Sequence, residues 1–178
     1  MKKCTLTLSL LAILISASAY ARSQIKTQEN LGTSPITTEK PVTNQYQPQD
    51  KLPDKYLSDL AEKNGDVVNV KGKVANLDKI IKFIEDYESK KSTQGDMVRI
   101  TNYTTEGDAI ITDLIIDSTG MKLIEDTTRD EFSNAEGRKR TEYGVTAIQK
   151  STKPEGITYT TKTDKGEEVF LFYEPNNK

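Results

Sequence analysis

The sequence predicts an α+β domain: an antiparallel β-meander with one main amphipathic helix packed on one face and a short N-terminal helix. Three observations support this fold class. Apolar residues recur at helical spacing between residues 76 and 90. The chain after Asp96 is rich in β-branched and aromatic residues without a helical period, and loops ending in glycine interrupt it. A helix with one apolar stripe must pack on something, and the sheet would provide that surface.

Residues 1–21 have the pattern of a secretory signal peptide. Two lysines precede an apolar run from Leu6 to Ile15, which is too short to span a bilayer, and Ala19-Tyr20-Ala21 is an A-x-A cleavage pattern. The single cysteine, Cys4, precedes the run, whereas a lipid-anchored precursor carries its cysteine at the cleavage point. We expect cleavage after Ala21, no membrane span, and a protein that is secreted to the extracellular space or the cell envelope.

Composition excludes several chemistries from the mature chain. Histidine is absent and the only cysteine lies in the leader, which rules out Ser/His/Asp and Cys/His catalysis and His- or Cys-ligated zinc. The chain has 25 basic and 27 acidic residues; without the two leader lysines the balance is 23 − 27, or −4. Nucleic acid is therefore not an expected partner, because its affinity comes from neutralised phosphates.

Residues 22–52 are rich in Thr, Gln, Asn and Pro, and their apolar residues have no regular spacing. Such a segment buries too little surface to offset its ordering entropy, so it is predicted to be a disordered linker. The folded part is then a single domain over residues 53–175, which we expect to be a monomer.

Two helices and one strand are predicted in the first part of this domain. DKYLSDLAEK, residues 54–63, is a short helix that ends before Asn64-Gly65, and DVVNVKG, residues 66–72, reads as a strand. The main helix, NLDKIIKFIEDYESK, has Asn76 as its N-cap. Its apolar stripe consists of Leu77, Ile80, Ile81, Ile84 and Tyr87.

Three loops that end in glycine set the register of the meander: Thr105-Glu106-Gly107, Ser118-Thr119-Gly120 and Asp164-Lys165-Gly166. With three-residue loops, Arg99 lies opposite Asp113, and Asp113 lies opposite Glu125. In the last hairpin, Thr160 lies opposite Phe170, and Tyr159 opposite Leu171. A slip of one residue would turn every side chain of a strand to the other face.

The predicted row of Arg99, Asp113 and Glu125 is the first candidate binding site. It admits three interpretations: a surface ion pair, a buried and satisfied pair beneath another layer of structure, or a ligand-binding face in which the guanidinium recognises a carboxylate or phosphate.

Two further groups of charged residues are candidates. The connection DTTRD offers Asp126, Arg129 and Asp130, either as a turn with an Arg–Asp pair or as carboxylates for acid/base hydrolysis. Glu106 and Asp108 flank a tight turn and are weak metal candidates, because Ca²⁺ takes six to eight oxygen ligands. We predict no cofactor and no specific metal.

The runs NVKGKVANLDKIIKFIED, YTTEGDAIITDL and DTTRDEF resemble a family of small exported bacterial domains of unknown function, many of them lipoproteins. The resemblance covers about Val67 to Tyr173. It implies no activity, ligand or catalytic residue, and the position of Cys4 departs from the lipoprotein leader.

For function, we expect a non-enzymatic extracellular or cell-envelope binding or interaction module, with a protein or a small molecule as partner. The alternatives are a secreted hydrolase that works through carboxylates, with or without Ca²⁺ or Mg²⁺, and an inhibitor that presents a hairpin loop to a secreted enzyme.

Overall fold

The computed structural model describes residues 46–176. The predicted leader and residues 22–45 of the predicted linker lie outside this range. Among the described residues, no helix has the length and apolar character that a membrane crossing needs.

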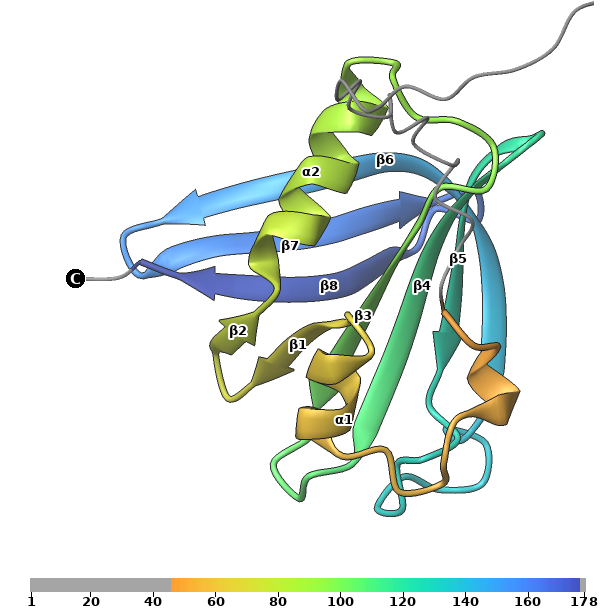
Figure 1. Cartoon of the computed structure of the whole chain (residues 1–178), viewed down its shortest axis with the longest axis vertical. Helices are drawn as coiled ribbons and strands as arrows, with labels where there is room; N and C mark the ends of the chain where they lie inside the picture. Colours follow the sequence, from red (N-terminus) through yellow and green to blue (C-terminus); the bar gives the residue numbers. More distant parts are fainter. Residues whose placement is uncertain (1–45, 177–178) are drawn as a thin grey trace, which may run out of the picture. The chain divides into compact units, whose positions relative to one another are not determined.

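The described residues form a mostly β fold whose centre is an eight-stranded, curled half-barrel sheet (Figure 1). Its strand order is β2-β1-β3-β4-β5-β6-β7-β8, and all neighbours are antiparallel except β1 and β3, which are parallel. The strands are β1 (Val67–Val70), β2 (Lys73–Ala75), β3 (Met97–Tyr103), β4 (Ala109–Asp117), β5 (Gly120–Asp126), β6 (Arg140–Lys153), β7 (Gly156–Thr163) and β8 (Glu168–Pro175).

The predicted α+β class is therefore wrong. The helical part amounts to α1 (Ser58–Lys63), the twelve-residue α2 (Leu77–Glu88) and one 3₁₀ turn (Gln49–Lys51), against eight strands. The sequence prediction also missed β2, which pairs with β1 through a two-residue turn. Lys71 and Gly72 there have φ angles of 51° and 83°, the left-handed conformations of a type I′ turn.

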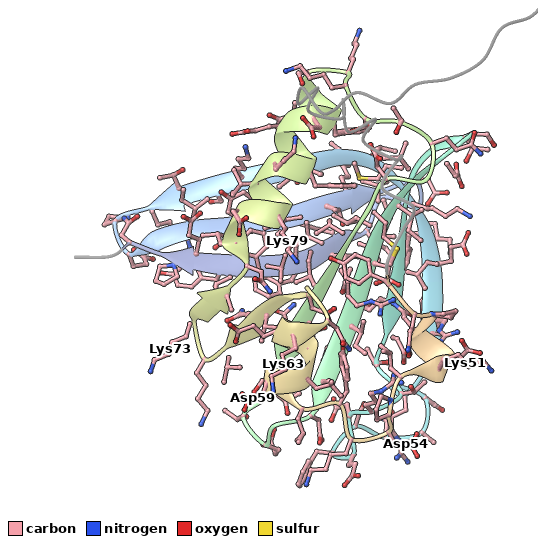
Figure 2. The ribbon with its side chains drawn as sticks, in the orientation of Figure 1. Lys51, Asp54, Asp59, Lys63, Lys73 and Lys79 are labelled. Carbon is pink, nitrogen blue, oxygen red and sulfur yellow. The ribbon has the colours of Figure 1, made fainter. Side chains whose placement is uncertain are left out.

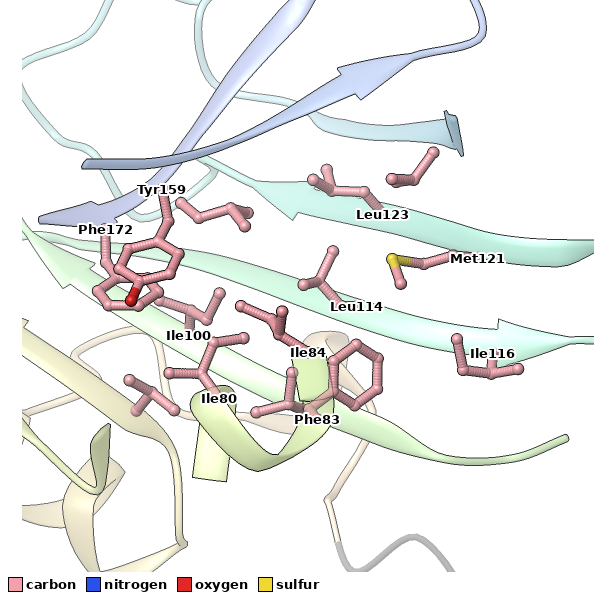
Figure 3. Close-up of a cluster of buried hydrophobic side chains, with 14 residues drawn as sticks. Ile80, Phe83, Ile84, Ile100, Leu114, Ile116, Met121, Leu123, Tyr159 and Phe172 are labelled. Atoms are coloured by element: carbon pink, nitrogen blue, oxygen red, sulfur yellow. The ribbon is translucent and has the colours of Figure 1, made fainter. Parts of the chain in front are cut away.

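The inner face of the curled sheet packs on α2, as Figure 3 shows. Ile80, Phe83 and Ile84 of α2 are buried against side chains from β3, β4 and β5, and Phe172 of β8 joins the same cluster. Strands from both halves of the sheet thus enclose one core. Asn76 precedes α2 in a left-handed conformation and makes no capping bond; its side-chain amide donates to the carbonyls of Glu62 and Asp66 instead.

The hairpin between β3 and β4 has the predicted register. Gly107 has a φ of 101°, Thr104 donates to the Asp108 carbonyl, and Arg99 lies opposite Asp113. The next hairpin is shifted by one residue from the prediction, because Asp117 lies opposite Gly120.

A side chain explains this shift. The carboxylate of Asp117 accepts from the amide and the hydroxyl of Thr119 at 2.7 and 2.6 Å, which closes a two-residue turn. Asp113 consequently lies opposite Ile124, and Glu125 lies opposite Thr112, on the other face of the sheet. The predicted row of three charges does not form.

The hairpin between β7 and β8 contains a bulge at Leu171. Thr160 lies opposite Phe170 as predicted, but Tyr159 lies opposite Phe172 and stacks on it at 4.3 Å between ring centroids. The bulged carbonyl of Leu171 accepts from the Asn102 amide of β3 at 2.6 Å. This hydrogen bond joins β8 to β3, which lies on the opposite side of the curled sheet.

Candidate functional site

Arg99 and Asp113 form a buried ion pair on the outer face of the sheet, the face opposite α2. The Arg99 Nε and Nη2 atoms donate to the two Asp113 carboxylate oxygens at 2.6 and 2.9 Å. Their side chains are only 1% and 5% exposed. Burial raises the pKa of Asp113, and the Arg99 guanidinium opposes that effect.

This pair is buried because residues 46–53, the covering segment, lie across it. The Gln47 carbonyl accepts from Arg99 Nη2 at 2.9 Å, and the guanidinium carbon lies 5.1 Å from the centre of the Tyr46 ring. Gln49 is buried and donates its side-chain amide to the Ile124 carbonyl. Residues 46–52 belong to the predicted linker, yet they pack on the sheet.

A second arginine holds the other end of the covering segment. Arg129 donates to the carbonyls of Gln49, Leu52 and Pro53 at 2.8, 3.1 and 3.0 Å. Its Nη1 atom donates to Asp126 at 2.9 Å, so the carboxylate orients the guanidinium. Burial opposes ionisation of Asp126, but bonds from Thr128 and Arg140 outweigh it and lower the pKa of this carboxyl.

The structure thus brings four of the six predicted binding residues into one arrangement, the arginine clamp: Arg99, Asp113, Asp126 and Arg129. Each aspartate orients an arginine, and the arginines bind backbone carbonyls of the covering segment. Of the three interpretations of Arg99 and Asp113, this is the buried, satisfied pair. Glu125 faces the other side, and Asp130 closes a local turn by accepting from Phe132 and Ser133.

The weak metal candidates do not converge. Glu106 is exposed and accepts from its neighbour Thr105, and Asp108 accepts from the Glu131 amide at 2.9 Å. Within residues 46–176, no three carboxylate side chains are grouped in a way that could hold a metal ion.

Asp66, which was not among the residues predicted from the sequence, is a fully buried carboxyl. Its Oδ2 atom accepts from Tyr56 and Thr101 at 2.9 and 2.7 Å, while its Oδ1 atom has no partner among the described residues. Burial raises the pKa of Asp66 above its ordinary value, and the two hydroxyl bonds only oppose this in part.

A pocket of about 370 Å³ lies between α2 and the start of β3; we call it the α2 pocket. Its residues are Tyr46, Asn64, Lys79, Lys82, Phe83, Asp86, Ser92, Gly95, Asp96, Met97 and Val98. Strand β1 pairs with residues 100–103 of β3, and the pocket lies beside the residues of β3 that precede this pairing.

The walls of the α2 pocket combine apolar and polar groups. Phe83 and Val98 are buried apolar residues, whereas Lys79 and Lys82 on α2 are exposed. The Ser92 hydroxyl is buried and has no hydrogen-bond partner among the described residues. This site was not predicted from the sequence, because its residues come from four separate stretches of chain and share no motif.

A comparison with family models finds one match, described as a domain of unknown function (DUF4362), over residues 64–160. Neither curated proteins nor solved structures give a match. The arginine clamp and all of the α2 pocket except Tyr46 lie within the matched residues, whereas the covering segment precedes them.

Proposed function

This chain belongs to the DUF4362 family of domains of unknown function, and from its own geometry we propose that it is a non-enzymatic binding module for a small ligand. We further propose that it acts in the extracellular space or the cell envelope. The support for export is the lysine pair, the apolar run and the A-x-A pattern of residues 1–21.

The observation that carries the binding proposal is the α2 pocket, in which the buried Ser92 hydroxyl has no hydrogen-bond partner within residues 46–176. A volume of about 370 Å³ lies in the range of small-molecule sites, which combine apolar walls with a few polar groups. A buried hydroxyl without a partner costs free energy, and a ligand that bonds to it would recover that cost.

The hydrolase alternative has less support. It requires two carboxyl groups that face each other across a cleft, one of them free to act as acid or base. Asp113 and Asp126 are instead each bonded to an arginine, while Glu125 lies on the opposite face.

Nuclear magnetic resonance tests the binding proposal directly. The purified protein, labelled with ¹⁵N, is mixed in turn with amino acids, short peptides, sugars, nucleotides and fatty acids. We expect at least one class to shift the backbone amides of residues 79–86 and 92–98. Ser92→Trp, which fills the pocket, should abolish that shift, whereas Gln94→Trp, on the exposed part of the same loop, should not. The proposal fails if no class at millimolar concentration shifts these amides.

A further inference from the structure

We propose that residues 46–53 of one copy of this chain bind the outer face of a second copy, in the place that the chain's own covering segment occupies. The outer face is then a groove for an extended peptide, and the covering segment is the peptide that fills it within one copy. This proposal goes beyond small-ligand binding and concerns the arginine clamp rather than the α2 pocket.

The covering segment turns every third side chain towards the domain. Tyr46 is half-buried and Gln49 and Leu52 are buried, whereas the residues between them are exposed. Pro48 and Leu52 have ψ angles of 141° and 151°, and residues 49–51 form a 3₁₀ turn. Both conformations have three residues per turn, so the three inward side chains lie in one row. A linear peptide in a recognition groove has this arrangement of anchors.

Each anchor has its own site on the domain. The Tyr46 hydroxyl donates to the Gly65 carbonyl at 2.9 Å, and the Gln49 amide donates to the Ile124 carbonyl at 3.1 Å. Leu52 packs into a second apolar cluster, separate from the core under α2. The other buried members of this cluster are Tyr56, Ala61, Val68, Ala109 and Ile111. Three sites at fixed spacing select a segment of the form Tyr-x-x-Gln-x-x-Leu.

The arginine clamp supplies the part of the groove that recognises backbone. Arg99 and Arg129 are oriented by Asp113 and Asp126, two buried aspartates that belong to β4 and β5. The carbonyls that the two arginines bind are those of Gln47, Gln49, Leu52 and Pro53. Because each donor is held by the sheet rather than by the segment, the groove is pre-organised for any chain with the same anchors.

The covering segment is attached in a way that permits exchange. Within residues 46–176, no strand of the sheet pairs with it, so its release breaks side-chain contacts and no strand ladder. Asp54 and Lys55 connect it to the buried Tyr56, and both are exposed; Figure 2 shows Asp54 at the outside of the fold. A second copy carries the same anchors at the same spacing, so an exchanged segment makes the same contacts between chains.

The short tether decides when exchange occurs. A ligand tethered by a few residues has an effective concentration in the millimolar range, so the chain's own segment wins in dilute protein. The chain is therefore monomeric at micromolar concentration. Exchange dominates when the tether is too short for the segment to reach its own groove.

Deletion of Asp54 and Lys55 from the full chain tests this directly. The deletion shortens the connection by about 7 Å, so the segment cannot fill its own groove while Tyr56 stays buried. We expect size-exclusion chromatography with light scattering to show a dimer, and an excess of acetylated and amidated peptide of residues 46–53 to return it to a monomer. Insertion of Gly-Ser at the same place lengthens the tether and should leave a monomer. A monomeric deletion variant would overturn the proposal.

Fluorescence anisotropy with the same capped peptide, labelled at one end, tests the groove itself. Gln49→Ala with Leu52→Ala removes two anchors from the chain's own segment, so the full-length variant should bind the peptide at least about tenfold more tightly than the unsubstituted protein does. Gln49→Ala alone, which keeps Leu52 in its cluster, replaces the double variant if that variant does not fold.

Peptide variants separate the anchors from the exposed positions. Gln49→Ala in the peptide should weaken binding, because it loses the bond to the Ile124 carbonyl, whereas Asp50→Ala, at an exposed position, should not. Failure of the protein variants to bind the peptide, or equal effects of the two peptide substitutions, would show that the outer face is not a groove for this segment.

Discussion

Arg99 and Asp113 lie opposite each other on β3 and β4, and two hydrogen bonds of 2.6 and 2.9 Å join the guanidinium to the carboxylate beneath the covering segment. The same guanidinium binds the Gln47 carbonyl, so the pair joins the sheet to the segment that precedes the family domain. A buried pair of this kind is satisfied only when both partners are present.

Asp113→Ala should therefore lower the free energy of unfolding by about 3–5 kcal/mol, because it leaves the Arg99 guanidinium buried without its counter-charge. Urea denaturation at pH 7 measures the change. The double variant Arg99→Met with Asp113→Leu removes both charges of this pair and should recover most of the loss. A cost below about 1 kcal/mol for Asp113→Ala, typical of exposed pairs, would mean that water reaches this pair.

Arg129→Lys should release the covering segment while the sheet stays folded. A lysine cannot reproduce the planar fork that binds three carbonyls and Asp126 together. The amides of Lys51 and Leu52, which donate within the segment's own turn, should exchange with deuterium at least about tenfold faster.

The matched control for Arg129→Lys is Arg138→Lys, an exposed arginine in the same connection. It should leave hydrogen exchange at Lys51 and Leu52 unchanged. Faster exchange throughout β3 and β4 in Arg129→Lys would instead mean that the covering segment and the sheet unfold together.

The sequence predicts the local geometry of the fold better than its architecture. The turn at Gly107 and the alternation along β3 and β4 placed Arg99 opposite Asp113 correctly, because both are local signals. The next register failed because the Asp117 side chain, rather than the glycine, sets the turn length. The predicted fold class was wrong because the one amphipathic helix was taken as a full layer of an α+β fold. The short strand β2 was not predicted at all.

The candidate sites show the same limit. The charged residues of the arginine clamp were predicted as candidates from the sequence. Their binding partners were not, because the backbone carbonyls of the covering segment have no signature in the sequence. The α2 pocket lies beside the start of β3, and its lining residues, among them Lys79, Ser92 and Asp96, come together only in the folded chain.

Asp66→Asn should change the pH dependence of stability. Because burial raises the pKa of Asp66 in the folded state, that state binds the proton more tightly than the unfolded chain does. This contribution is complete below the unfolded pKa of about 4 and is lost as the pH rises through the folded value. The variant has no such loss, so its unfolding free energy relative to the unsubstituted protein should increase between pH 4 and pH 7.

Urea denaturation of both proteins at several pH values measures that difference, and Asp59→Asn, on the exposed side of α1 in Figure 2, controls for the loss of one negative charge. The asparagine still offers one oxygen to Tyr56 and Thr101, so the fold should persist. A difference that stays constant from pH 4 to pH 7 would contradict a raised pKa at Asp66.

Asn102→Ala should loosen β8. The Asn102 amide donates to the bulged Leu171 carbonyl, and its oxygen accepts from Asn69 of β1 at 3.0 Å, so one side chain connects three strands. Its removal leaves a carbonyl and an amide without partners, which should cost about 1–3 kcal/mol. Hydrogen exchange should accelerate most in residues 169–173.

Asn176→Ala removes a comparable bond to Pro154 at the exposed end of β8 and should have little effect. Unchanged exchange in β8 of Asn102→Ala would show that core contacts such as the stacking of Tyr159 on Phe172 are enough to hold the curl.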